Sequence, residues 1–271
     1  MLIKHEESHR PVKLVQITDC HLGENEGDDL LGMDTDYSLQ QVTELILREE
    51  GVPDLLLATG DLSNHGHLGA YQRFLEISRN VAKNSVWLPG NHDNPGLMRD
   101  VVANGAELSP FVDIGCWRII MLDSTVAGEV GGNFSEQALA SLLELLEHSS
   151  AEYVLVCLHH HPVPVGCAWL DEQMVANADD FFAILDRFKQ VRGVLWGHVH
   201  QQLDSERNGV KLMSTPSSCV QFAKNSPAFK LDKSNPGYRS LQLHSDGRIE
   251  TGVSRVVAVE FTVDYESSRG Y

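Results

Sequence analysis

The sequence lacks the hallmarks of a membrane protein and of a disulfide-stabilised protein. No run of roughly 18 apolar residues occurs, and the opening MLIKHEESHRP has no apolar stretch of signal-peptide length. The five cysteines include no C-x-x-C pair, which argues against a disulfide framework and against a cysteine zinc site. We therefore expect a cytoplasmic protein with no membrane partner.

Positive charge is also scarce. Lys and Arg total 21 against 38 for Asp and Glu, which gives a net charge of −17. Proteins that bind duplex nucleic acid usually present a basic surface, because neutralising phosphates supplies much of the affinity. A duplex partner is therefore not expected, whereas a small anionic substrate is compatible if a metal supplies local positive charge. Histidine, in contrast, is abundant, with 13 residues.

The order of apolar segments predicts an α/β fold. Strand-like and helix-like segments alternate first, and only strand-like segments follow. The predicted strands are 12–18, 54–60, 84–90, 117–124, 153–159, 191–197, 210–216, 238–244 and 248–259, and the predicted helices are 36–50, 68–82, 135–149 and 179–189. We expect the strands after 210 to form a second sheet packed on an α/β core. One domain, 1–271, is the simplest organisation, with its core at about 12–259 and a loosely held tail at 260–271.

Polar side chains suited to chemistry follow five of the predicted strands. The blocks are TDCHLG with Asp19 and His21, ATGDLS with Asp61, LPGNHD with Asn91, His92 and Asp93, CLHHHP with His159, His160 and His161, and WGHVHQ with His198 and His200. Ligand sites of open α/β sheets form at the carboxyl ends of strands. If the backbone stays extended there, residues two apart point to one side.

The residue types in these blocks suit a metal pair. Carboxylates and imidazoles bind Mn, Fe, Zn, Co or Ni, and no cysteine is required. Two metals about 3.5–4 Å apart can clamp a phosphoester for in-line displacement. Asp61, which emerges alone from its strand, is the candidate bridging ligand. Each block taken singly is more often an ordinary turn, helix cap or surface loop than a metal site, so the inference depends on their combination.

Together the five blocks resemble the signature of the calcineurin-like metallophosphoesterases. The resemblance implies two mixed β-sheets packed as a sandwich flanked by helices, in four α/β/β/α layers. It also implies a dinuclear centre, with iron and manganese as the leading metals and zinc, cobalt or nickel as alternatives. The implied ligands are Asp19, His21 and His200 for the first metal, Asn91, His160 and His198 for the second, and Asp61 between them. His160 is chosen because the family's ligand stands two residues before proline.

A mechanism follows from the resemblance. A metal-bridging hydroxide would attack phosphorus, and His92 would stabilise developing charge or protonate the leaving oxygen. Asp93 would orient His92, although a helix-start role suits Asp93 equally well.

The segments HHHPVPVGCAWLDEQMVANADDF and STPSSCVQF resemble those of bacterial class III 3′,5′-cyclic-nucleotide phosphodiesterases. This likeness implies hydrolysis of cyclic AMP to 5′-AMP, with a small cyclic nucleotide as the partner. Trp169 either stacks on the purine or covers the core edge, and Cys219 either lines the base pocket or belongs to a plain strand. The expected substrate contacts are Asn91, His92, His200, His161, Trp169 and Cys219.

Other functions stay open. Another phosphodiesterase or phosphatase of the same fold would carry the same blocks, acting on a glycerophosphodiester, a 2′,3′-cyclic nucleotide or a phosphomonoester. A non-catalytic scaffold is a third alternative, but such a protein would be expected to have lost ligands that this chain keeps. Both a monomer and a homodimer are compatible with the sequence.

Overall fold

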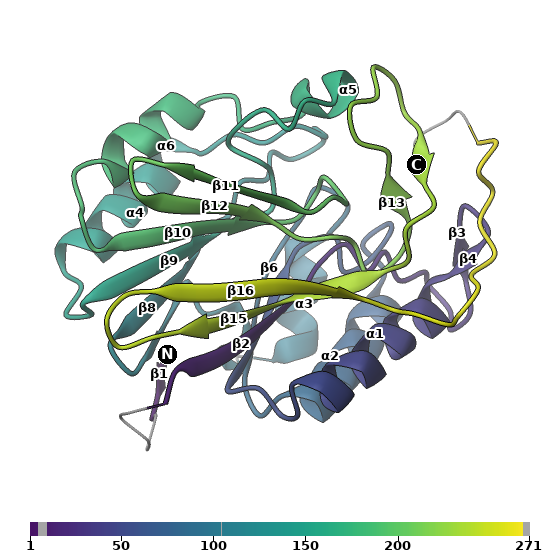
Figure 1. Ribbon diagram of the computed structural model, residues 1–271, viewed down its shortest axis with the longest axis horizontal. Helices are drawn as coiled ribbons and strands as arrows, with labels where there is room; N and C mark the ends of the chain where they lie inside the picture. The colour runs from purple at the N-terminus through teal and green to yellow at the C-terminus, as the bar shows by residue number, and fades with distance from the viewer. Residues whose placement is uncertain (5–9, 104, 268–271) are drawn as a thin grey trace.

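A computed structural model of the chain describes residues 1–4, 10–103 and 105–267. Two large β-sheets pack face to face, and helices cover both outer faces (Figure 1). The seven-stranded sheet has the order β1-β7-β8-β9-β10-β12-β11, and the five-stranded sheet has the order β16-β15-β2-β5-β6. Both sheets mix parallel and antiparallel pairs. The expected sandwich of two mixed sheets flanked by helices is confirmed.

The elements have the following bounds. The seven-stranded sheet contains β1 (Leu2–Ile3), β7 (Phe111–Ile114), β8 (Trp117–Met121), β9 (Tyr153–Cys157), β10 (Val191–Trp196), β12 (Val210–Ser214) and β11 (Leu203–Arg207). The five-stranded sheet contains β16 (Ile249–Arg255), β15 (Gly237–Leu243), β2 (Val12–Ile17), β5 (Leu55–Thr59) and β6 (Ser85–Leu88). The short pairs are β3 (Asp29–Leu30) with β4 (Met33–Asp34), and β13 (Gln221–Phe222) with β14 (Leu231–Asp232). The helices are α1 (Thr35–Glu49), α2 (Leu68–Val81), α3 (Pro95–Val102), α4 (Glu136–Glu147), α5 (Ala168–Asp171), α6 (Ala178–Leu185) and a 3₁₀ turn (Ala106–Leu108).

The strand β5 shows why its sequence is apolar throughout. Leu55 and Leu57 belong to the core between the two sheets, whereas Leu56 and Ala58 belong to the core beneath the helices. A strand covered on both faces needs apolar residues at every position, because successive side chains point to opposite faces. Layered packing therefore explains the continuous run LLLAT.

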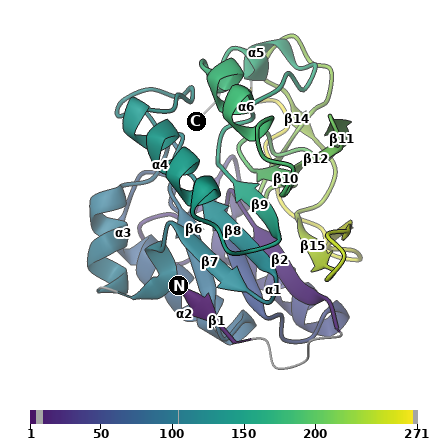
Figure 2. The ribbon, with the colours of Figure 1, turned by 90° about the vertical axis from the view of Figure 1, so that its left-hand side faces the viewer.

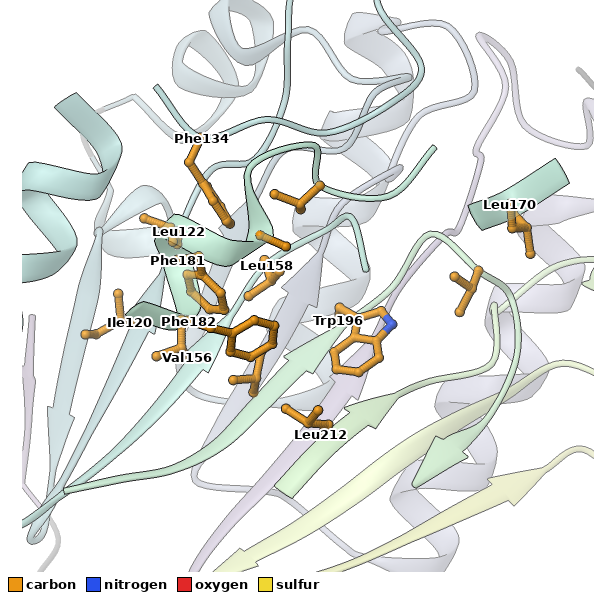
Figure 3. Packing of buried hydrophobic residues seen from close by; sticks show 14 of the residues in the cluster. Ile120, Leu122, Phe134, Val156, Leu158, Leu170, Phe181, Phe182, Trp196 and Leu212 are labelled. Carbon is orange, nitrogen blue, oxygen red and sulfur yellow. The ribbon is translucent and has the colours of Figure 1, made fainter. Parts of the chain in front are cut away.

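The outer face of the seven-stranded sheet is covered by α4 and α6 (Figure 2). Ile120 of β8 and Val156 of β9 lie in one cluster with Phe181 and Phe182 of α6 (Figure 3). α1 and α2 cover the outer face of the other sheet. Helices thereby cover the outer faces of both sheets, and the polar blocks stand just beyond the ends of the covered strands.

The expectation of a separate sheet after residue 210 is wrong. β12 and β11 extend the sheet of β10, and β15 and β16 extend the sheet of β2. Met213 of β12 and Leu241 of β15 both lie in the core between the sheets. Each sheet gains apolar inner-face residues from a late strand pair, so the late strands complete the existing sandwich.

Residues near both ends of the chain also pack against the domain to a greater extent than expected. β1 pairs in parallel with β7, so the folded core begins before residue 12. In the tail, the Asp264 N–H donates to the Leu31 carbonyl at 2.7 Å, and the ring of Phe261 lies 6.0 Å from that of Tyr37. Residues 260–267 are therefore packed against the domain, whereas 268–271 lie outside the described residues. Within the described chain, no helix is both long enough and apolar enough to span a membrane.

Candidate metal centre

The five polar blocks meet at one edge of the sandwich. They follow β2, β5 and β6 of one sheet and β9 and β10 of the other. Asp19, His159 and His160 are fully buried, and Asp61 is 2% exposed. The sequence-based prediction that these strand ends share one site is supported by this arrangement.

The backbone at these positions differs from the extended geometry that the sequence suggested. Asp19, His21, Asp61, His198 and His200 have φ values of 53°, 48°, 51°, 64° and 47°. All five lie just beyond their strands, in the left-handed region that residues other than glycine seldom adopt. Strain of this kind concentrates at functional sites, where the surrounding structure holds it.

Glycines allow the loops of the site to approach one another. A Cβ at Gly60, before Asp61, would overlap the ring of His159 and lie 2.8 Å from the Gly90 nitrogen. A Cβ at Gly197, before His198, would overlap the Thr18 side chain. The G-D and G-H pairs of the sequence therefore reflect close packing between blocks, in addition to turn formation.

A first group of ligand atoms comes from Asp19, His21 and His200, which lie within 4.8 Å of one another. The Nε2 atoms of His21 and His200 are 3.3 Å apart, and His200 Nε2 is 3.4 Å from Asp19 Oδ1. His200 Nδ1 lies 2.8 Å from the Val220 carbonyl, which can only accept a hydrogen bond. In a neutral ring the Nε2 lone pair therefore faces the group, as a metal ligand requires.

A second group surrounds His159. Its Nε2 lies 3.1 Å from Asn91 Oδ1, and its Nδ1 lies 2.8 Å from the Thr59 carbonyl. The ring of His198 is 5.1 Å from that of His159, centroid to centroid. His198 Nε2 is buried and has no hydrogen-bond partner within the described residues. A cation between these rings would give that nitrogen the partner that its burial requires.

His160 is placed differently from the expectation. Its Nδ1 lies 2.8 Å from Ser124 Oγ, and its Nε2 lies 3.0 Å from the Val130 carbonyl. Its ring still lies close to His159 and His198, and the three offer one possible ligand group. Nε2 of His159 faces Asn91 and Asp61, which are themselves candidate ligands, whereas both ring nitrogens of His160 face non-ligand atoms. The contacts therefore favour His159 as the ligand of this block. The spacing to Pro162, which led to His160 in the sequence analysis, did not reveal this difference between His159 and His160.

Asp61 lies between the two groups. Its Oδ2 is 3.7 Å from His21 Nε2 and 3.3 Å from His159 Nε2, and its Oδ1 accepts the backbone N–H of His92 at 2.9 Å. Burial by itself favours the neutral acid, but His159 and His92 hold the pKa of Asp61 well below its ordinary value. An ionised carboxylate facing both groups has the geometry of a bridging ligand.

The charges of the site fit bound cations. Asp19 and Asp61 are buried, and within the described residues neither forms an ion pair with Lys or Arg. Burial would lower the pKa of His159, yet Asp61 raises it to about 9. Buried carboxylates need compensating positive charge. The oxygen and nitrogen donors therefore fit two transition-metal ions, in agreement with the residue types.

His92 lies at the edge of the centre. Its ring is 4.9 Å from that of His21, edge to face, and its Nδ1 lies 2.8 Å from the Asn64 carbonyl. This carbonyl orients the ring, a role that the sequence assigned to Asp93. Because Nδ1 faces this carbonyl, proton exchange by His92 at the site would use Nε2.

Asp93 instead joins the loops that carry the ligands. Its carboxylate accepts backbone N–H bonds from Gly90, Ser63 and Leu62 at 2.9, 3.0 and 3.2 Å, and a bond from the Tyr71 hydroxyl at 3.0 Å. Burial and the charge of Asp61 raise its pKa to about 6. No hydrogen bond or ion pair links it to the His92 ring within the described residues. The predicted orienting role, and the alternative of a helix cap, are both replaced by this loop contact, since Asn94 caps α3.

A pocket opens above the centre. Its walls are Asp61, Asn91, His92, His198, His200, Val130, Trp169, Gln173, Phe222 and Phe229. Trp169 packs against the core and also lines this pocket, so the core-edge position is compatible with a place in the base site. His161 and Cys219 are fully buried and are absent from the lining, which argues against the predicted substrate contacts of both. The Cys219 sulfur accepts a bond from Ser217 Oγ at 3.2 Å.

Comparisons with known proteins agree with this geometry. Residues 12–202 match the family described as Calcineurin-like phosphoesterase. The chain is 44% identical over 260 residues to the 3′,5′-cyclic adenosine monophosphate phosphodiesterase CpdA of Pseudomonas aeruginosa, covering 96% of this chain and 95% of that protein. It is 41% identical to the protein of the same name from Vibrio vulnificus, covering 97% of each. A purple acid phosphatase from yellow lupin shares the fold, with a TM-score of 0.66 at 13% identity, over 94% of this chain and 53% of that one.

Proposed function

The chain belongs to the calcineurin-like phosphoesterase family, and from this premise we propose that it hydrolyses 3′,5′-cyclic AMP to 5′-AMP with two bound metal ions. The observation that carries the metal chemistry is the Asp61 carboxylate, whose Oδ2 faces both ligand groups on the floor of a pocket. The substrate class comes from the relatives in Pseudomonas aeruginosa and Vibrio vulnificus, whose names specify the cyclic nucleotide.

The ligand assignment follows the contacts in the structure. Asp19, His21 and His200 would hold the first metal, Asn91, His159 and His198 the second, and Asp61 both. Iron and manganese are the proposed metals, and zinc, cobalt and nickel suit the same donors. When bound, the pair supplies a Lewis acid for the phosphoryl oxygens and an activated water.

The protein's own contribution is orientation and proton transfer. The Asn64 carbonyl accepts from Nδ1 of His92 and fixes the ring, so His92 would act as the acid in its imidazolium form and donate the second proton, on Nε2, to the leaving oxygen. General acid catalysis of this kind is worth about 10²–10⁴-fold in rate. Asn91 and His200, which line the pocket floor, would contact the phosphate. Hydrolysis of the cyclic ester then leaves the phosphate on the 5′ oxygen.

The wall of the pocket suits a nucleoside. Trp169 lies edge to face with Phe222 and Phe229, at centroid distances of 5.0 and 5.3 Å. Stacking of a base on an aromatic side chain is worth about 1–3 kcal/mol. We assign the aromatic wall formed by Trp169, Phe222 and Phe229 to the purine. A net charge of −17 opposes a duplex nucleic-acid substrate, and the proposed location is the cytoplasm.

A substrate panel tests the proposal. The metal-loaded protein is assayed with cyclic AMP, cyclic GMP, 2′,3′-cyclic AMP, a glycerophosphodiester and p-nitrophenyl phosphate. We expect the highest kcat/KM for cyclic AMP, with 5′-AMP as the product. Faster turnover of the 2′,3′-cyclic ester, the glycerophosphodiester or the monoester would assign the same centre to a different phosphoester. A protein inactive on the whole panel would favour a non-catalytic role.

A further inference from the structure

The pocket is lined by two kinds of side chain. Histidine, aspartate and asparagine side chains belong to the metal centre, and most of the remaining lining residues present carbon. Phe222 stacks flat on His200, with centroids 4.1 Å apart and planes 6° apart, so the carbon-rich lining is in direct contact with the metal centre. Among the described lining residues outside the metal centre, Gln173 is the one that offers both a donor and an acceptor, whereas Trp169 offers only its indole N–H.

The backbone of Gln173 is held on both sides. Its N–H donates to the Leu170 carbonyl at 2.8 Å, and its carbonyl accepts the Gly132 N–H at 3.3 Å. Its side-chain amide makes no hydrogen bond within the described residues, although the side chain is half-buried on the pocket wall. An amide in such a place is fixed at its base and keeps its full hydrogen-bonding capacity for a ligand.

The amide matches the edge of adenine. Adenine presents an amino group at N6, which donates, next to N1, which accepts. The oxygen of a glutamine amide can accept from N6 while its nitrogen donates to N1 or, on the other edge, to N7. We infer that Gln173 reads the base of the cyclic nucleotide and sets the preference for adenine. The inference rests on the proposed function and deepens it by naming a specificity residue.

Changing Gln173 to Glu tests the inference, because it replaces the amide donor with a second acceptor. Guanine presents donors at both N1 and N2, so a carboxylate can accept two hydrogen bonds from guanine. Against adenine, the same carboxylate faces the lone pair of N1. We expect the ratio of kcat/KM for cyclic GMP to that for cyclic AMP to rise by about tenfold or more in Gln173→Glu. Gln173→Ala should lose preference for adenine without gaining activity on cyclic GMP.

The control is Glu172→Gln, an exposed neighbouring position outside the pocket lining, which should keep the wild-type ratio. Metal content and thermal unfolding are measured for each variant, and rates are referenced to bis(p-nitrophenyl) phosphate, which has no purine. Equal losses on both purines, with an unchanged ratio, would overturn the assignment of Gln173. Wild-type protein that hydrolyses neither cyclic purine would instead refute the proposed function on which the assignment rests.

Discussion

Replacing Asp93 with Asn distinguishes two possible roles of this residue: orienting the His92 ring, and joining the loops that carry the ligands. In the structure each carboxylate oxygen accepts two bonds: Oδ2 from Gly90 and Leu62, and Oδ1 from Ser63 and the Tyr71 hydroxyl. The least costly orientation of the amide keeps an oxygen toward Gly90 and Leu62. Its NH₂ group then faces Ser63 N–H, which loses its acceptor.

The magnitude follows from these contacts. One buried N–H without an acceptor costs about 1–3 kcal/mol, and the remaining bonds lose the charge of Asp93, so the total is about 2–4 kcal/mol. For a chain of this size each kcal/mol lowers the Tm by about 2–4 °C. We expect Asp93→Asn to melt about 5–15 °C lower by calorimetry, with kcat per metal-loaded molecule within about threefold of wild type.

The opposite pattern would refute this reasoning. If Asp93 orients His92, its substitution should lower kcat by about 10²–10⁴-fold, as expected for loss of a general acid, with little change in Tm. Tyr71→Phe serves as a comparison, since it leaves the carboxylate in place and removes a hydroxyl that donates to Asp93 and accepts the Asn94 N–H at 2.7 Å. We expect it to cost about 1–3 kcal/mol, because the Asn94 N–H loses its acceptor.

Three further predictions concern the site and the pocket. His159→Ala should abolish binding of one metal per chain, whereas His160→Ala should retain both metals and lose mainly stability. Elemental analysis of the two variants measures this, and the reverse result would contradict the ligand assignment. His92→Ala should keep both metals and lower kcat by about 10²–10⁴-fold, and full activity would rule out the acid role. Trp169→Ala should raise the KM for cyclic AMP by about tenfold or more, and an unchanged KM would remove Trp169 from the base site.

The sequence was sufficient to locate the site because its chemistry stands directly after strands. Asp61 follows LLLATG and His198 follows VLWG, so each polar residue is marked by the apolar run before it. The carboxyl ends of these strands converge in the fold, and the five blocks converge with them. The local pattern of apolar runs and the order of the strands were enough to predict that the five blocks meet.

Contacts between distant segments were not predictable in the same way. Whether His159 or His160 faces the centre depends on Ser124 and Val130, which engage the ring of His160 from another loop. The partners of Asp93 lie up to 31 residues away along the chain. No local pattern signals such pairs.

Backbone conformation was a second source of error. Reading GHVH as extended placed both histidines on one side, but His198 and His200 each adopt positive φ. Propensity gives little warning of this conformation in histidine, because it is held by the surrounding structure. The Gln173 side of the pocket escaped notice for a related reason, since its wall combines α5 and the residues after it with the distant strand β13 and the loop that follows β13.

The central claim is that two metals, joined by Asp61, hydrolyse a cyclic nucleotide. Metal-free protein titrated with Mn²⁺, with bound metal and cyclic AMP hydrolysis followed together, tests it most directly. We predict that activity appears with metal, reaches its plateau at two equivalents per chain, and is absent from Asp61→Ala at every ratio. Hydrolysis that persists in metal-free protein, or that is complete at one equivalent, would contradict the account.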